Sequence, residues 1–205
     1  MAINLSKGQK ISLSKEAPNL KVALVGLGWD IKQYDSGADY DLDASIFLLN
    51  ANGKCAHESD FIFYNNLSSN GVTHSGDNRT GEGDGDDEAV TIEFEKVPDY
   101  IQKIAVTVTI YDASARGQNF GQVQNAFVRL VDKQTGSELL RFDLGEDYST
   151  ENGDRICGNL SSQRRMEVLR SRFRLQRRTR GALQAVRLEC LMIQHPGSRQ
   201  IIQKG

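Results

Sequence analysis

Two stretches of this sequence concentrate carboxylate side chains. Residues 74–88 read HSGDNRTGEGDGDDE and hold six acids, one arginine and four glycines. Residues 39–43 read DYDLD, and a strand there would turn Asp39, Asp41 and Asp43 to one face. Carboxylates about 6–7 Å apart repel one another unless a positive charge lies between them. The two stretches therefore indicate either a bound cation or an acidic surface that water solvates.

Oxygen donors dominate around these acids. Asp30 is a further acid, and Asn65 and Asn66 offer neutral amide oxygens. Ca²⁺ takes about six to eight hard oxygen ligands in flexible geometry, whereas zinc and copper prefer the cysteine and histidine that are nearly absent here. The spacing is not that of an EF-hand, because the loop glycine and closing glutamate are missing. His74 borders the cluster, and we expect a loop histidine of this kind to be solvated.

The sequence offers no convincing catalytic set. His57, His74 and His195 have no recognisable serine, cysteine or acidic partner for nucleophilic catalysis. GEGDG at 81–85 is not a phosphate loop, because it lacks the Lys-Ser/Thr ending and its acids would repel phosphate. We therefore expect no enzyme. A metal-assisted hydrolase built on the same acids is the enzymatic alternative.

Short alternating or apolar runs, bounded by Gly, Asn and Asp, predict strands through most of residues 1–151. We expect these strands at 10–13, 21–27, 41–49, 60–64, 88–94, 103–111, 125–132 and 138–144. Turns are expected at 51–54 and 133–136, and only 114–122 could hold a helical turn. Many short strands at close spacing predict an all-β fold, an antiparallel β-sandwich.

Length, hydropathy and cysteine content limit the class of protein. A chain of 205 residues can form one domain with a sizeable core. No apolar run approaches the roughly 18 residues of a membrane helix, and we expect no transmembrane segment and no signal peptide. The three cysteines are an odd number without metal-like spacing. They fit a reducing compartment, so we expect a cytoplasmic protein.

Charge changes abruptly along the chain. Residues 152–205 hold eleven Arg, one Lys and three acids, a net charge of +9. Residues 1–151 hold thirteen bases and twenty-four acids, a net charge of −11. The change predicts two segments of different origin or role: a folded domain over 1–151 and an Arg-rich tail over 152–205.

Six long motifs follow one another along residues 1–151. They are LVGLGWD (24–30), YDLDASIFLL (40–49), DFIFYNNLSS (60–69), HSGDNRTGEGDGDDE (74–88), VTIYDASARGQNFGQVQNAFVRLVD (108–132) and FDLGEDYSTE (142–151). These motifs resemble the TerD family, also called tellurium-resistance or general stress proteins. The resemblance implies a cytoplasmic bacterial protein with a C2-like β-sandwich. It also implies a non-enzymatic role in resistance to tellurite and other chemical stress.

The resemblance also implies two Ca²⁺ ions between the DLDAS strand and the GDNRTGEGDGDDE loop. Carried over by motif, the ligands are Asp30, Asp41, Asp43, Asn65, Asn66, Asp77, Asn78, Asp86, Asp87 and Glu88, with further oxygens from Thr80, Gly81 and Gly83. Two such ions would neutralise about four charges and stabilise the fold by mass action. The calcium-bound form would present a surface to a protein partner in stress resistance. Peripheral association with a membrane is a further expectation.

The family pattern ends after Glu151, where a hairpin is expected. Shifting the possible codons of the tail by one base turns Met166-Glu167 into a Trp codon. The same frame permits TAIVFAEIYRHNGEWKF, which resembles the missing family sequence. We therefore expect a frameshift after Glu151, with the tail as coil or helix. The sandwich would then lack its last hairpin and leave a strand edge unpaired.

A genuine basic extension is the alternative interpretation of the tail. Eleven arginines would suit nucleic acid or another anion. The apolar residues of 164–191 follow a helical period only roughly. The alternative function is therefore nucleic-acid or anion binding through residues 152–205.

Overall fold

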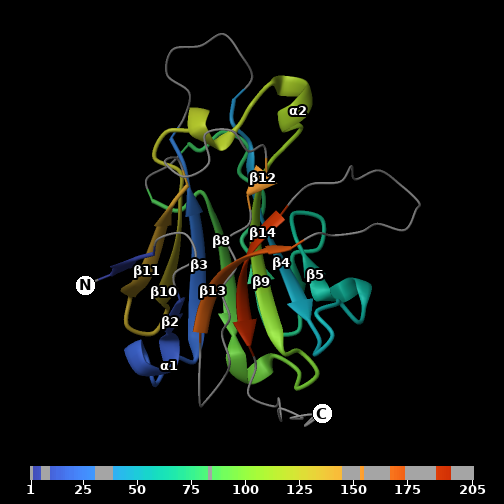
Figure 1. The fold of residues 1–205 in the computed structure, drawn as a ribbon, viewed down its shortest axis with the longest axis vertical. Helices are drawn as coiled ribbons and strands as arrows, with labels where there is room; N and C mark the ends of the chain where they lie inside the picture. The colour runs from blue at the N-terminus through green and yellow to red at the C-terminus, as the bar shows by residue number, and fades with distance from the viewer. Residues whose placement is uncertain are drawn as a thin grey trace, which may run out of the picture.

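The strands of the protein form two sheets that face each other across one apolar core (Figure 1). The computed structural model describes residues 2–5, 10–30, 39–82, 85–144, 153–154, 167–173 and 188–194. The all-β fold and the sandwich that the sequence predicted are confirmed. In the part of the chain that is described, no helix is long and apolar enough to cross a membrane.

The first sheet carries both ends of the acidic loop. Its strand order is β1-β11-β10-β3-β8-β7-β6. The bounds are β1 (Ile3–Asn4), β3 (Val22–Gly28), β6 (Ser68–Ser69), β7 (Val72–His74), β8 (Glu88–Glu93), β10 (Phe127–Asp132) and β11 (Ser137–Asp143). Neighbouring strands are antiparallel except β1, which pairs in parallel with β11, so the sheet is mixed. Residues 75–87 connect β7 to its neighbour β8 at one end of this sheet.

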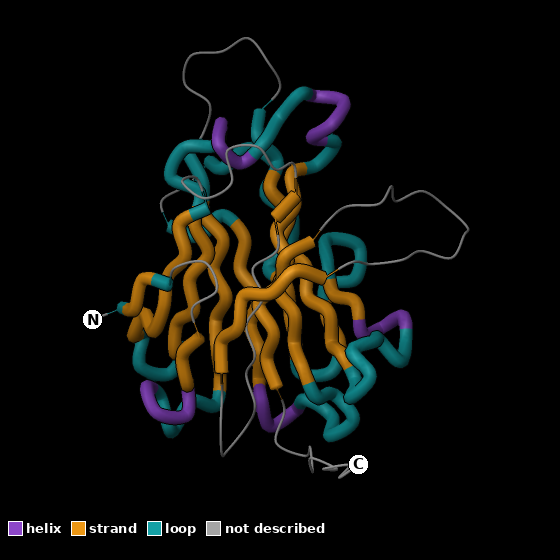
Figure 2. The backbone as a smooth tube through the Cα atoms, viewed as in Figure 1, coloured by secondary structure: helices purple, strands orange, loops and turns teal. Residues whose placement is uncertain are grey.

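The second sheet carries the other acids, at the start of its strand β4. Its order is β2-β13-β14-β9-β4-β5, and β12 also pairs with β9. The bounds are β2 (Lys10–Ser12), β4 (Leu42–Leu49), β5 (Phe61–Ile62), β9 (Lys103–Ile110), β12 (Gly153–Asp154), β13 (Glu167–Phe173) and β14 (Leu188–Gln194). Short helical turns join the strands (Figure 2): α1 (Leu13–Glu16), η1 (Glu58–Asp60), η2 (Phe94–Lys96), α2 (Ala113–Arg116) and η3 (Phe120–Gln122).

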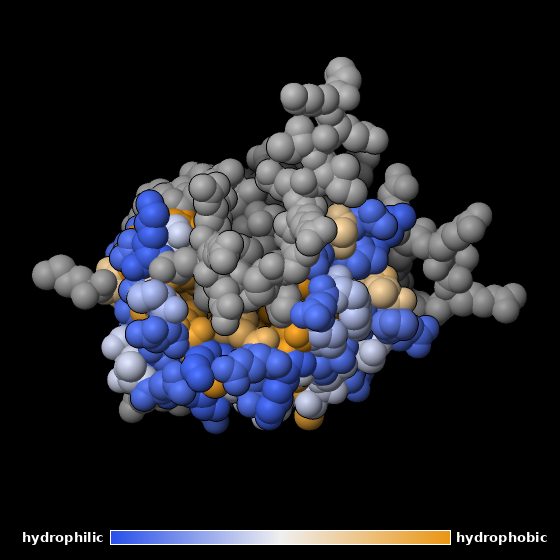
Figure 3. All heavy atoms as spheres, turned by 90° about the horizontal axis from the view of Figure 1, so that it is seen from below, coloured by the Kyte–Doolittle hydropathy of each residue, from blue (hydrophilic) through white to orange (hydrophobic). Residues whose placement is uncertain are grey.

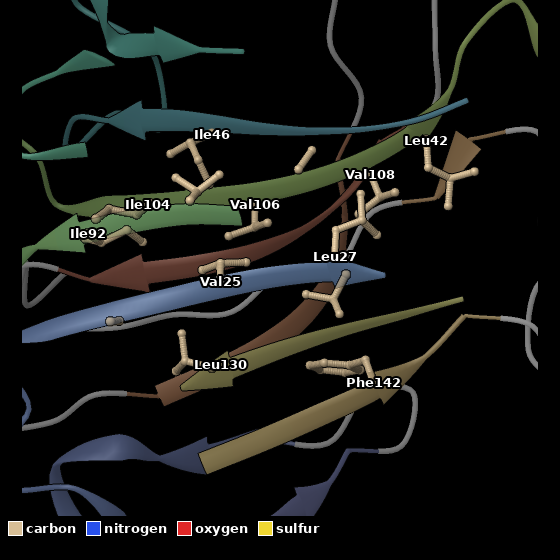
Figure 4. Packing of buried hydrophobic residues seen from close by; sticks show 14 of the residues in the cluster. Val25, Leu27, Leu42, Ile46, Ile92, Ile104, Val106, Val108, Leu130 and Phe142 are labelled. Atoms are coloured by element: carbon tan, nitrogen blue, oxygen red, sulfur yellow. The ribbon is translucent and has the colours of Figure 1, made fainter. Parts of the chain in front are cut away.

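The core lies between the sheets because alternate residues of each strand point inward. Val25 and Leu27 of β3 face Val106 and Val108 of β9 (Figure 4). Burying one aliphatic side chain of this size contributes about 1.5–3 kcal/mol. Seen from below, hydrophilic residues cover most of the coloured surface, and apolar residues show near the middle of this face (Figure 3). This core fixes the two sheets relative to each other, and with them the acids at the sheet ends.

Every run predicted as a strand overlaps one in the structure. The turns are also confirmed: Gly53 and Gly136 have φ of 71° and 72°, in the left-handed region that turn glycines favour. The helical turn expected within 114–122 corresponds to α2 and η3. Strands β1, β6 and β7 were not predicted, because two or three residues are too few to establish a period of two.

The structure corrects the expectation for the tail. Its described parts are strands β12, β13 and β14 rather than coil or helix. β13 and β14 pair as antiparallel neighbours, and β14 pairs with β9 from Leu191↔Val106 to Gln194↔Lys103. β9 therefore has a neighbour on both sides within the described residues, and its edge is not left unpaired. Backbone hydrogen bonds allow this, because an exposed strand edge accepts many sequences.

Candidate metal centre

Three carboxylates meet where the two sheets approach the acidic loop. Asp41 precedes β4, Asp43 lies within it, and Asp77 lies in the loop that follows β7. One carboxylate oxygen from each lies within 4.8 Å of the other two. Asp41 and Asp43 are buried, whereas Asp77 is exposed. We call these three residues the acidic triad; two of its members come from the same strand end, as the spacing predicted.

The triad fits a hard cation. Asp41 is about nine-tenths buried, and within the described residues its Oδ1 accepts no hydrogen bond. A buried carboxylate oxygen without a donor costs free energy that a coordinated cation would recover. All donors in the triad are carboxylate oxygens, which suit Ca²⁺ and disfavour soft metals.

The electrostatics of the triad point the same way. Burial, together with the charges of Glu88, Asp41 and Asp77, raises the pKa of Asp43 to about 7. Burial and the charge of Asp77 also raise the pKa of Asp41, while Arg116 and Arg79 oppose that rise. These carboxylates are therefore costly to ionise together, and a divalent cation would favour their charged form.

Glu88 and His74 fasten the first sheet to the second beside the triad. The Ala44 N–H of β4 donates to Glu88 Oε2 at 2.8 Å. His74 Nε2 lies 3.0 Å from the Ala44 carbonyl oxygen and 3.5 Å from Glu88 Oε2. The Gly76 N–H donates to His74 Nδ1, so the proton of the neutral ring lies on Nε2. His74 is thus buried, and the expectation that it is solvated is wrong.

The acidic loop is folded by its own side chains. Asn78 Oδ1 accepts from the N–H groups of Thr80 and Gly81 at 3.1 Å, and its Nδ2 donates to Asp87 Oδ1. Gly81 has a φ of 73° and lies so close to the Trp29 indole that a Cβ there would be 2.5 Å from Trp29 Nε1. Asn78 therefore organises the loop, and its side-chain oxygen is already used.

Asp87 holds the far end of this loop against strand β3. Its Oδ2 accepts from the Trp29 N–H at 2.9 Å. Burial raises the pKa of Asp87 against that hydrogen bond, and Asp86 and Asp30 raise it further. Asp30 is exposed and accepts from Asn125 Nδ2 at 2.6 Å. Asp30 and Asp87 thus lie near each other but outside the acidic triad.

Asp86 is not brought to the triad. Its carboxylate forms a two-pronged ion pair with Arg129, with Nε–Oδ1 at 2.8 Å and Nη2–Oδ2 at 3.0 Å. Arg129 also donates to Glu138 at 3.2 Å. The pair lies over Gly26, where a Cβ would come within 2.2 Å of the Asp86 carboxylate. In this geometry Asp86 is an anchor for the loop, because Arg129 takes both of its oxygens.

The remaining predicted ligands make hydrogen bonds of their own, are exposed, or lie outside the described residues. Asn66 closes a turn through its backbone and donates from Nδ2 to the Phe61 carbonyl at 2.6 Å. Asn65 is exposed in the same turn, and Gly83 lies outside the described residues. Thr80 Oγ1 accepts from the Glu82 N–H. The described residues gather one group of three acids, so the second ion stays a prediction.

The sequence analysis did not predict the roles of two residues of the site, His74 and Arg129. His74 could have been found, since Val72 and His74 alternate with exposed Thr73 and therefore share the inward face of β7. Arg129 could not, because nothing local to β10 indicates a partner 43 residues earlier in the chain.

Comparison with known proteins gives a consistent match. A family model of the TerD domain matches residues 1–165. The chain is 59% identical over 153 residues to tellurium resistance protein TerD of Serratia marcescens, covering 74% of this chain and 79% of that protein. It is 58% identical over 153 residues to general stress protein 16U of Bacillus subtilis (strain 168), with the same coverage. In fold it resembles the crystal structure of a TerD homologue from Streptomyces coelicolor A3(2), with TM-score 0.58, 23% identity, and 75% and 83% of the two chains covered.

The Asp86–Arg129 pair should contribute to stability. We expect Asp86→Asn to lower the free energy of unfolding by about 1–3 kcal/mol, because a half-buried charged hydrogen bond is lost. The matched control is Asp143→Asn, whose partner Arg141 and own carboxylate are more exposed. We expect that change to cost about 0.5 kcal/mol or less. Urea unfolding measures both, and equal losses would contradict an anchoring role.

The metal-free protein should lose stability as pH rises. The folded-state pKa of Asp43, about 7, lies above the unfolded value near 3.8. Its contribution is therefore complete below pH 3.8 and is lost as pH rises through about 7. In chelator, we expect Asp43→Asn to remove on the order of 2 kcal/mol of the difference in unfolding free energy between pH 5 and pH 8. Asp99→Asn, at an exposed acid, is the control, and an unchanged pH slope in Asp43→Asn would refute the assignment.

Proposed function

This chain belongs to the TerD domain family, and we propose that it serves there as a calcium-binding, non-enzymatic module of a stress response. One observation carries the proposal. The acidic triad places three carboxylates together, and the buried Asp41 Oδ1 accepts no hydrogen bond within the described residues. A cation is the partner that this arrangement fits best.

Asp41, Asp43 and Asp77 would hold the ion. Calcium supplies the positive charge that offsets their repulsion, and it also accepts ligands from outside the protein. The residues of this chain set the geometry: β4 holds two of the acids in place, and the loop brings the third. The second ion of the proposal would use Asp30 and Asp87, which lie near enough that Asp30 affects the pKa of Asp87.

Calcium would join the loop to the second sheet. Asp77 belongs to the loop after β7, whereas Asp41 and Asp43 belong to the β4 end, so one ion would connect both. The ordered loop would form the surface that a protein partner of stress resistance recognises. The names of the relatives, tellurium resistance and general stress proteins, support this class of role. We place the activity in the cytoplasm, because Cys55, the cysteine of the folded domain, is a free thiol as a reducing compartment would leave it.

The tail over 152–205 is, in this proposal, an out-of-frame reading of the family's C-terminal segment. The pairing of β13 and β14 is compatible with this, because it uses backbone groups that most sequences supply. None of the described contacts favours the alternative function, nucleic-acid binding through the tail, and we do not propose it.

Calcium should raise the melting temperature of the full chain. At a concentration about a hundred times its Kd, a bound ion contributes about 2.7 kcal/mol, which corresponds to about 5–10 °C for a protein of this size. We expect Ca²⁺ to produce this shift and Mg²⁺ to produce less. Asp43→Asn should remove the shift, and Asp99→Asn, a change of the same type at an exposed acid outside the loop, should retain it. A melting temperature indifferent to calcium would refute the proposal.

The gene itself tests the origin of the tail. We expect resequencing across the codon of Glu151 to show that the present reading contains one extra nucleotide after that codon. The corrected frame should encode a hairpin with an Asn-Gly turn and a Trp. An unchanged sequence in independently prepared DNA would show that the tail is genuine.

A further inference from the structure

The exposed side of the acidic triad carries two arginines. Arg79 Nε lies 3.0 Å from Asp77 Oδ2, and its side chain is 77% exposed. Arg116 donates from Nη1 to the Asp39 carbonyl at 3.4 Å, and its guanidinium lies 5.1 Å from the Tyr111 ring centroid. Each arginine is thus held by a residue in the triad or beside it. Both also lower the pKa of Asp41, as expected of cations close to that carboxylate.

Two exposed tyrosines also lie on the exposed side of the acidic triad. Tyr111 is half exposed, and its N–H donates to the Asp41 carbonyl at 2.8 Å. Tyr64 is 36% exposed. Burial raises the pKa of Tyr64, and the charges of Asp43, Tyr111 and Asp77 raise it further, as expected of a phenol in the neighbourhood of these carboxylates. The exposed side of the triad therefore combines guanidinium and phenol groups around a group of acids.

The local charge explains what these donors could bind. When fully ionised, the triad and the buried Glu88 carry four negative charges against the two arginines, so an anion is repelled in the absence of metal. One divalent cation would neutralise the two negative charges that the arginines leave unbalanced. Three carboxylates also leave coordination positions on Ca²⁺ unfilled, because the ion takes about six to eight oxygens and carboxylates often bind through one. Asp77 is the exposed member of the triad, so a ligand from outside the protein would approach the ion from its side.

We propose that the calcium-loaded triad, with Arg79 and Arg116, forms a binding site for a phosphate group. One phosphate oxygen would complete the coordination of the ion, and the others would accept from the two guanidinium groups. A tetrahedral phosphate suits three separate positive partners, and guanidinium matches phosphate geometry closely. The inference rests on the calcium site proposed above. The phosphate could belong to a small phosphate ester or to a lipid headgroup, which share this chemistry.

Calcium-dependent phosphate binding can be measured on the full chain by calorimetry with glycerol 3-phosphate. We expect binding in Ca²⁺ and none in chelator. Arg79→Gln and Arg116→Gln should each weaken it by about tenfold, because a charged hydrogen bond is lost. Both variants should bind calcium at least as tightly as the parent chain, since they remove positive charge. Arg141→Gln, whose guanidinium lies over the Phe127 ring, is the matched control and should change neither affinity.

Vesicles distinguish the source of the phosphate. Phosphatidylcholine vesicles with and without phosphatidylserine are sedimented with the protein in Ca²⁺ and in chelator. The basic tail can bind anionic vesicles by itself, so the calcium-dependent fraction is the quantity compared. Calcium-dependent binding to phosphatidylserine vesicles alone would identify a lipid headgroup, and binding to glycerol 3-phosphate would identify a soluble ester. Either result supports the proposal if Arg79→Gln and Arg116→Gln reduce it.

Two results would overturn the inference. The first is calcium binding without calcium-dependent binding of the ester or the vesicles, which would leave the calcium site intact and remove only the phosphate site. The second is phosphate binding that Arg79→Gln and Arg116→Gln do not weaken relative to Arg141→Gln. Absence of calcium binding in the parent chain would instead refute the proposed function, and the phosphate site with it.

Discussion

The buried carboxylate of Glu88 joins three parts of the molecule that lie far apart in the chain. It accepts from Ala44 N–H of the second sheet and Asn78 N–H of the loop, and it lies 3.5 Å from His74 Nε2. β5 pairs with β4 only at Ile46 and Phe47, so among the described residues no strand covers that edge of Ala44. Glu88 and His74 provide the missing partners, because a buried backbone group without one is costly. Asp43 precedes Ala44, and Asp77 precedes Asn78, and Glu88 accepts from the N–H groups of both neighbours. These hydrogen bonds fix the positions of the two acids.

This arrangement concentrates negative charge where the sandwich can tolerate it. The apolar core gives the two sheets a stable relative position, and the acids lie at their ends rather than within it. Burial and like charge raise the pKa of Asp43 and Asp41, so the metal-free site holds its charge at a cost. A cation removes that cost. Stability and ligand binding are therefore coupled through the same carboxylates.

The acids of the loop between β7 and β8 have different contacts and different structural roles. Asp77 joins the triad, Asp86 pairs with Arg129 on the outer face of the first sheet, and Asp87 accepts from the Trp29 N–H. The bare backbone at Gly26 leaves the space that Asp86 occupies. Anchoring one end of the loop to the sheet limits where the other end can lie. The loop thus presents Asp77 to the triad without contributing every acid to it.

Some of this was determined by the sequence alone. Alternation of apolar and polar residues identified the main strands, because a period of two can be seen in neighbouring residues. The spacing of Asp41 and Asp43 placed both side chains on one face of the strand. Motif resemblance gave the family. Only the tertiary structure decided which partner each acid contacts and therefore which role it has. This applies to Asp77, Asp86, Asp87 and Glu88. Each role depends on a partner brought near by sheet packing, such as Arg129, Trp29 or Ala44, and local sequence does not encode which residues will meet. For the same reason strands β13 and β14 escaped prediction: they are defined by pairing with β9 and β2, which lie elsewhere in the chain.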